Sequence, residues 1–258
     1  MALDYDTRLQ YLQAMGIEIW LPKNLPVTHI AMPLDEQQTD YACLSDVVVT
    51  HEPDLLNTAS LADAHVQNTV NLTHDHWDKL ADDVKNCTRC DLCKTRKNTV
   101  FGSGNLQAEW LLIGEAPGQS EDEQGLPFVG NAGLLLTEML RAMGVDREEV
   151  FIANILKCRP PNNRDPKPEE AEQCNEYLQR QFALIKPKII LAVGRIAAQT
   201  LLNTQAPIGQ LRGKVHTFNH TPVIVVYHPS YLLRSPLEKR KAWIDLQFAL
   251  HTFKTVKG

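Results

Sequence analysis

Four short apolar runs alternate with helical stretches across residues 83–258, and this alternation limits the possible fold more than any other feature. The apolar runs, which have the length of buried strands, occupy 109–114, 150–155, 188–194 and 222–228. Apolar residues at helical spacing occupy 131–143, 168–185, 195–202 and 237–252. Strands that alternate with helices predict an α/β fold, in which helices cover both faces of a parallel sheet.

Polar and turn-forming residues follow three of the four predicted strands. The first strand leads into GEAPGQSED, the second ends in NILKCRPPNNR and the fourth ends in YHPSYLLR. Ligands of such sheets bind beyond the carboxyl ends of the strands. The three segments therefore predict one shared cleft.

Charge divides the chain into two unlike parts. Residues 1–82 hold 3 Lys and Arg against 13 Asp and Glu, a net charge of −10, whereas residues 83–258 carry +5. The stretch 24–75 is polar, acidic and without lasting periodicity. We therefore predict an acidic N-terminal extension over 1–82, made of a short helix and a partly disordered linker, ahead of a domain over 83–258. The positive charge of this domain permits nucleic-acid binding but does not require it.

The compartment is predicted from what the sequence lacks. No run approaches the ~18 consecutive apolar residues that a membrane span needs. The N-terminus, MALDYDTRLQ, has no basic stretch followed by an apolar one, as a secretory signal would. We expect a cytoplasmic protein, and clustered cysteines in that compartment bind metal more often than they form disulfides.

Cysteines form a candidate metal site. Cys87 and Cys90 make a C-x2-C pair, and fifteen residues separate Cys158 from Cys174. Cys158 lies in the loop after the second predicted strand and Cys174 in the helix that follows, so folding can bring all four together. By spacing alone, four thiolates can hold either Zn²⁺ or a [4Fe–4S] cluster. Buried thiols that bind nothing are the remaining alternative.

The order of the motifs is more specific than any one of them. The C-x2-C pair is followed by GEAPGQSEDEQGLPFVGNAG, ANILKCRPP and HPSYLLR. Together they resemble the family 4 uracil-DNA glycosylases, over roughly residues 84–250. The resemblance implies a monomer with a three-layer α/β/α sandwich and a four-stranded parallel sheet. It also implies a [4Fe–4S] cluster, with zinc as the alternative, on Cys87, Cys90, Cys158 and Cys174, which leaves Cys93 spare.

The activity that the resemblance implies is hydrolysis of the N-glycosidic bond of deoxyuridine in DNA, the first step of base-excision repair. The products are free uracil and an abasic site. No lysine in the motifs is placed as a Schiff-base nucleophile, so we predict a monofunctional glycosylase without a lyase step. The partner of the domain is therefore uracil-containing DNA.

Five residues are expected to form the base pocket and the catalytic groups. By resemblance, Phe128 stacks on uracil, and the Asn154 amide reads uracil O4 and N3–H. His228 would donate a hydrogen bond to uracil O2 as negative charge builds there, as donors do in an oxyanion hole. Glu115 would orient the attacking water or stabilise the cationic sugar. Gly114 would let the backbone approach the base closely.

The remaining predicted contacts lie beside this pocket. Ala116 stands where family 1 glycosylases carry an aspartate that handles the water, so Glu115 is expected to take over part of that work. Glu121 is a second acidic candidate, expected to organise the loop. Leu232 and Leu233 lie beside Arg234, and apolar side chains next to cations suit a loop that enters the duplex and contacts phosphate.

Two rival functions follow from the same sequence. Certain relatives bind uracil DNA and trap it covalently through a histidine after the second strand; residues 155–170 contain no histidine, which favours turnover. The other rival is a non-catalytic iron–sulfur adaptor that recruits replication or repair proteins. The apolar segment within residues 1–22 suggests a peptide that docks onto a replication or repair protein, unless it is a helix that folds onto its own domain.

Overall fold

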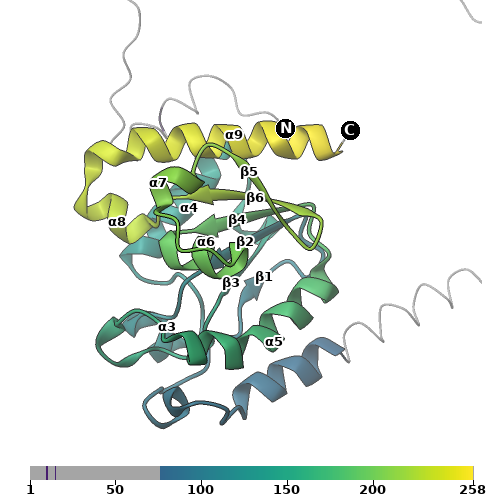
Figure 1. Ribbon diagram of the computed structural model, residues 1–258, viewed down its shortest axis with the longest axis vertical. Coiled ribbons are helices and arrows are strands. Elements are labelled where there is room, and N and C mark those ends of the chain that lie inside the picture. Colours follow the sequence, from purple (N-terminus) through teal and green to yellow (C-terminus); the bar gives the residue numbers. More distant parts are fainter. Residues whose placement is uncertain (1–9, 11–14, 16–75, 258) are drawn as a thin grey trace, which may run out of the picture. The chain divides into compact units, whose positions relative to one another are not determined.

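The structure, a computed structural model, describes Gln10, Met15 and residues 76–257 (Figure 1). Within these residues a six-stranded sheet has the order β1-β3-β2-β4-β6-β5. Its four inner strands are parallel: β2 (Trp110–Gly114), β3 (Val150–Asn154), β4 (Ile189–Val193) and β6 (Thr221–Val226). The predicted α/β fold is thus confirmed, and the four predicted parallel strands form the middle of a sheet that has six strands.

Two antiparallel edge strands were not predicted. β1 (Ser103–Gly104) pairs with β3, and β5 (Val215–Phe218) pairs with β6. β1 is too short to give a pattern, and β5 is only half-buried, so neither forms an apolar run. The β5–β6 turn has Asn219 and His220 at positive φ, 46° and 66°, as a two-residue hairpin turn of type I′ requires.

Helices cover both faces of the sheet. The long helices are α4 (Asn131–Met143), α5 (Pro168–Ile185), α6 (Arg195–Leu202) and α9 (Lys239–Lys257). The first three have the bounds that apolar spacing predicted. Shorter helices are α3 (Gln119–Gln124), α7 (Ile208–Leu211) and α8 (Pro229–Arg234), with 3-10 turns at Asp91–Lys94, Arg147–Glu149, Pro161–Asn163 and Pro236–Glu238.

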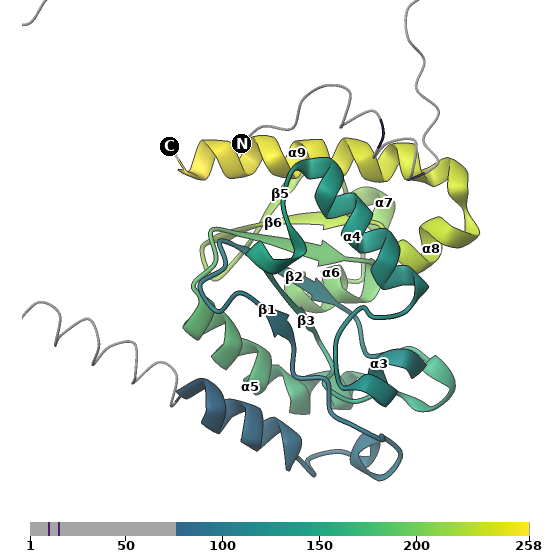
Figure 2. The ribbon, with the colours of Figure 1, turned by 180° about the vertical axis from the view of Figure 1, so that it is seen from behind.

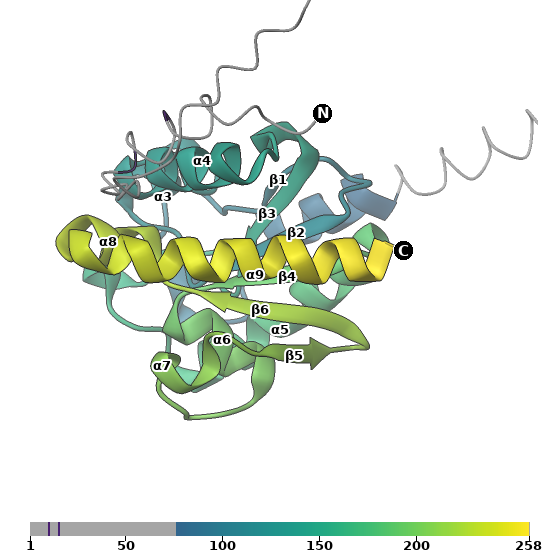
Figure 3. The same ribbon diagram turned by 90° about the horizontal axis from the view of Figure 1, so that it is seen from above.

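Alternate residues of each inner strand face opposite layers, as the two-residue period of a strand dictates. In β2, Leu111 and Ile113 pack in the layer of α5 and α6, whereas Trp110 and Leu112 pack in the layer of α4 and α9. Figure 3 shows α9 running along the sheet. Because both faces are buried, the inner strands read as continuous apolar runs.

The compact domain begins before residue 83. Residues 76–85 are helical, and Trp77, Leu80 and Val84 are buried at helical spacing in the core beside α5 (Figure 2). Residues 76–82 therefore belong with the domain and not with the acidic extension, because their acidic groups lie on the outer side of an amphipathic helix. The helix, linker and docking peptide expected over residues 1–75 lie outside the described residues, apart from Gln10 and Met15.

None of the helices in the described part of the chain is long and apolar enough to span a membrane.

Candidate active site and cysteine cavity

An open cleft of about 740 Å³ lies where the four parallel strands end. Its walls come from the segments that follow these strands, including Glu115 after β2, Asn154 at the end of β3, Gly194 after β4 and His228 after β6. Glu121, Phe128, Ala116 and Arg234 also line it. The structure therefore brings the predicted motif residues together in one cleft.

Gly114 lies next to two residues that are predicted to contact the base, Asn154 and Phe128. A Cβ added to Gly114 would lie 2.4 Å from Asn154 Oδ1 and 2.8 Å from the Phe128 ring. In the sheet, Gly114 and Asn154 are register partners on neighbouring parallel strands. Glycine is required here because any side chain would fill the space between the amide and the ring.

Asn154 has an unusual hydrogen-bonding state. The residue is 2% exposed, and its Oδ1 is a buried side-chain oxygen without a hydrogen-bond partner among the described residues. Such an atom costs about 1–3 kcal/mol of stability unless something pairs with it. A ligand that offers an N–H group at the cleft would satisfy Oδ1.

The loop that carries Phe128 is held in a strained conformation. Phe128 has φ of 53°, which is unfavourable for a bulky side chain. Glu121 Oε1 accepts hydrogen bonds from Val129 N (2.9 Å) and Gly130 N (3.1 Å), and Arg147 donates to the carbonyl of Phe128 (3.1 Å). The predicted loop-organising contact of Glu121 is therefore present. These bonds fix the ring over Gly114, 5.6 Å from the His228 ring centroid.

His228 is half-buried and oriented by the start of α8. Its Nδ1 accepts a hydrogen bond from Ser230 N at 3.1 Å and lies 2.7 Å from Ser230 Oγ. Burial lowers the pKa of His228 to about 4, and the nearby Arg234 acts in the same direction. The imidazole is therefore neutral near pH 7, and because Nδ1 is an acceptor, the proton is on Nε2.

Glu115 lies close to two charged residues of the cleft. Burial, assisted by the negative charge of Asp165, raises the pKa of Glu115 to about 7, while Arg195 opposes this shift. Arg195 donates to Asp165 Oδ2 at 2.7 Å. A carboxyl group with a pKa near neutrality can exchange a proton at physiological pH, as general acid–base catalysis requires.

The predicted DNA contact of Leu232 is wrong. Leu232 is 1% exposed and packs in the core with α4 and α9, whereas Leu233 is 46% exposed and Arg234 faces the cleft. The error arose because both leucines lie in the short helix α8, where successive side chains point about 100° apart. Only Leu233 of the pair remains free to contact DNA.

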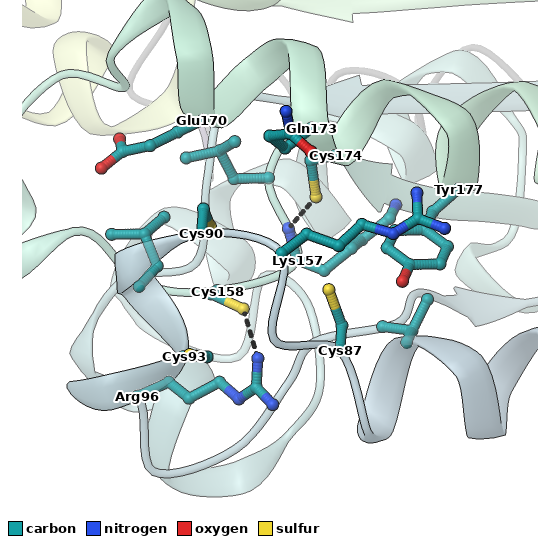
Figure 4. A pocket seen from close by; sticks show the side chains of 14 residues that line it. Cys87, Cys90, Cys93, Arg96, Lys157, Cys158, Glu170, Gln173, Cys174 and Tyr177 are labelled. Carbon is teal, nitrogen blue, oxygen red and sulfur yellow. Dashed lines mark hydrogen bonds between the residues drawn. The ribbon is translucent and has the colours of Figure 1, made fainter.

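The four predicted cysteine ligands line a second, smaller cavity. It is narrow, with a volume of about 10 Å³, and Cys87, Cys90, Cys158 and Cys174 all border it, together with Cys93. Figure 4 shows the sulfur atoms of Cys87, Cys158 and Cys174 directed toward the same space. These five cysteines, which are those in the described part of the chain, are free thiols. The C-x2-C turn, the loop after β3 and α5 thus meet at this cavity.

Hydrogen-bond donors face two of these sulfur atoms. Arg96 donates to Cys158 Sγ at 3.1 Å, and the Lys157 backbone N–H donates to Cys174 Sγ at 3.3 Å. Burial raises the pKa of the Cys158 thiol to about 11 and also raises that of Cys174. Among the described side chains, no three His, Cys, Asp or Glu residues are placed to hold a single metal ion.

Three contacts of the site were missed from sequence. A Cβ on Gly194 would lie 3.0 Å from His228 Cβ, and φ of 97° there favours glycine. Arg147 holds the Phe128 loop, and the buried Lys157 lies behind Asn154. The glycine directly after a buried strand was a signal for Gly194, whereas Arg147 and Lys157 gave none, because their contacts form only when distant elements pack.

Comparison with known proteins gives consistent matches. A family model described as the uracil DNA glycosylase superfamily matches residues 101–247. The Type-4 uracil-DNA glycosylase of Archaeoglobus fulgidus is 48% identical over 167 residues, which are 62% of this chain and 84% of that protein. The Type-4 enzyme of Thermotoga maritima is 46% identical over 59% of this chain and 80% of its own. A Type-5 enzyme of Thermus thermophilus is 32% identical over 47% of this chain and 60% of its own.

Proposed function

The chain belongs to the uracil DNA glycosylase superfamily, and from that membership we propose that it hydrolyses the N-glycosidic bond of deoxyuridine in DNA. The products are free uracil and an abasic site, and the reaction begins base-excision repair. The observation that carries the proposal is that Phe128 and Asn154 meet at Gly114, with the His228 ring 5.6 Å from the Phe128 ring, at the carboxyl ends of the parallel strands.

Base recognition follows from the groups that surround Gly114. The extruded uracil stacks on Phe128, a contact worth about 1–3 kcal/mol. The unpaired Oδ1 of Asn154 accepts the uracil N3–H, and the amide nitrogen donates to O4. Cytosine presents an amino group in place of O4 and an acceptor in place of N3–H, so the same amide rejects it.

Bond cleavage requires charge stabilisation at both fragments. Electrons of the breaking bond go to the base, and the neutral His228 donates from Nε2 to uracil O2 as the anion forms. Glu115, when ionised, stabilises the positive charge on the sugar or orients the water that attacks it. Leu233 and Arg234 contact the DNA beside the cleft.

The test is uracil release from DNA. A labelled oligonucleotide with one uracil, incubated with the protein and then treated with alkali, should break at the uracil, and an otherwise identical thymine oligonucleotide should not. Asn154→Ala should abolish the break. Intact uracil DNA would contradict the proposal, and a protein–DNA adduct that survives denaturation would favour the trapping alternative.

Glu115 predicts how the rate depends on pH. Since burial raises the pKa of Glu115 to about 7, the ionised fraction grows as pH rises. The single-turnover rate should therefore increase about tenfold per pH unit below pH 7 and level off above it. Glu115→Gln should remove this rise, and Glu172→Gln, on the exposed side of α5, should keep it. A rate of the wild type that is independent of pH would contradict this role.

The cysteine cavity is the proposed site of a [4Fe–4S] cluster. Cys87, Cys90, Cys158 and Cys174 would hold it. Four free thiols around one cavity and donors to two of the sulfurs support this, because hydrogen bonds to cysteine sulfur are typical of iron–sulfur sites. Bound there, the group would join the C-x2-C turn to α5.

Metal analysis tests this assignment. The purified protein should absorb near ~400 nm and contain about four iron atoms per chain. Cys174→Ala should lose the iron and the absorption and lower the melting temperature, whereas Cys93→Ala should retain all three. One zinc per chain without iron, or iron loss only in Cys93→Ala, would overturn the assignment.

The free thiols also support the expected compartment, since oxidising compartments favour disulfides. We therefore place the activity in the cytoplasm.

A further inference from the structure

A fully buried lysine lies directly behind the base pocket. Lys157 is 1% exposed, although lysine is almost never buried without a charged partner. Among the described residues no carboxylate pairs with its ammonium group; its Nζ instead donates to the Asn154 carbonyl at 2.9 Å and to Gln181 Oε1 at 2.7 Å. Both acceptors are neutral, but Lys157 also lines the cysteine cavity, where the Cys158 and Cys174 thiols act on its charge. A buried cation held in this way calls for an explanation beyond stability, because its desolvation is costly.

The hydrogen bonds of Lys157 connect it to a rigid frame. Gln181, on α5, is 0% exposed and donates from Nε2 to the carbonyl of Phe101 at 2.8 Å. The backbone of Lys157 accepts from Val100 N at 2.7 Å. The main chain of Lys157 is therefore held by Val100, and its side chain is held by Gln181. Together these contacts fix the position of Nζ relative to the end of β3.

This frame bears on Asn154, the residue that reads the base in the proposed function. Asn154 is the last residue of β3, where regular pairing gives way to a loop. Ile155 N and Leu156 N still donate to the carbonyls of Gly114 and Glu115, at 2.9 Å and 3.1 Å, so one edge of the strand end is held by the neighbouring strand. Lys157 Nζ holds the carbonyl of Asn154 itself. The backbone of Asn154 is thus fixed from both directions.

We propose that Lys157 is a positioning residue, which fixes the Asn154 backbone through its carbonyl and thereby aims the Asn154 amide at the edge of the bound uracil. Lys157 does not touch the substrate. The inference rests on the proposed function, and it adds a part of the base-reading apparatus that lies outside the cleft. The proposed role affects binding of the base and not cleavage of the bond, because Lys157 contacts Asn154, which reads uracil, and not Glu115 or His228.

Lys157→Met tests the proposal, since methionine keeps most of the apolar stem and removes the donors. The dissociation constant of free uracil, measured by calorimetry on the iron-loaded protein, should rise about tenfold. In uracil release, KM should rise by a similar factor, and the preference for uracil over cytosine should fall, while kcat changes little. Lys254→Met, at an exposed position of α9, should match the wild type in every measurement.

Iron content and melting temperature separate the outcomes. The proposal expects Lys157→Met to retain its iron. If iron and uracil affinity are lost together, the lysine supports the cysteine cavity instead, and the proposal is overturned. A fall in folded protein with unchanged affinity per folded molecule would show a purely structural role.

Should the variant fail to fold, Gln181→Leu, which removes one acceptor, must show the same change in KM and base preference. If the wild type releases no uracil, the proposed function fails first, independently of Lys157.

Discussion

Gly114→Ala is expected to reduce uracil release at least ~100-fold, the scale at which a misplacement of about 1 Å at a reacting centre lowers rate. The new Cβ would stand 2.4 Å from Asn154 Oδ1 and 2.8 Å from the Phe128 ring, so both groups must move away from the space between them. The reading amide and the stacking ring would be displaced together. The measurement is kcat/KM on a single-uracil oligonucleotide, with a melting curve of the same preparation.

Gly209→Ala is the matched control. It is also a glycine-to-alanine change, in α7, where an added Cβ meets no atom within 4 Å. It should leave kcat/KM unchanged and raise stability slightly, because alanine favours helices over glycine by about 1 kcal/mol. The crowding at Gly114 should lower stability by about 1–3 kcal/mol. Near-normal uracil release by Gly114→Ala would mean that the base does not bind beside Gly114.

His228→Ala should lower the rate of bond cleavage about 10²–10³-fold, as the loss of one oxyanion donor does in other enzymes. The neutral imidazole has its proton on Nε2, since Nδ1 accepts from Ser230 N. Alanine removes the only group we assign to uracil O2. The effect should appear in the single-turnover rate at saturating protein, because the donor acts mainly as charge develops on the base.

Stability must be measured alongside, because His228 also caps α8. Loss of the cap should destabilise the protein by about 1 kcal/mol, which leaves the chain folded at assay temperature. His251→Ala, at an exposed position of α9, is the control and should keep the wild-type rate. A decrease of less than about tenfold in His228→Ala would assign stabilisation of the uracil anion to another group.

The fold could be predicted wherever a periodic pattern was long enough. Both faces of the inner strands are buried, so they appear as apolar runs, and α4, α5 and α6 begin and end where the apolar spacing does. β1 has two residues and β5 is half-buried, and pairing of such edge strands depends on the sheet they join. The helix over 76–85 was not predicted, because its acidic outer surface resembles the acidic extension before it. Its apolar residues Trp77, Leu80 and Val84 nevertheless have helical spacing.

The candidate site could be predicted for the residues whose position in space follows from the order of strands along the chain. Residues that follow parallel strands must meet at one edge of the sheet, and that places Glu115, Asn154 and His228 together. The choice between Leu232 and Leu233 depends on the rotation of a six-residue helix, which its sequence does not determine. Lys157 could not be anticipated, because its acceptors come from β3 and α5, which are joined only by the fold.

The register of β2 and β3 has a consequence for how this protein would meet its substrate. Gly114 and Asn154 lie opposite each other on hydrogen-bonded strands in the middle of the sheet. The surface that binds the base is therefore formed when the chain folds, and it changes little when DNA binds. Most of the motion in an encounter must then come from the nucleic acid. Turnover should be fastest where the double helix is already weakened around the lesion, and slowest where neighbouring pairs hold it firmly stacked.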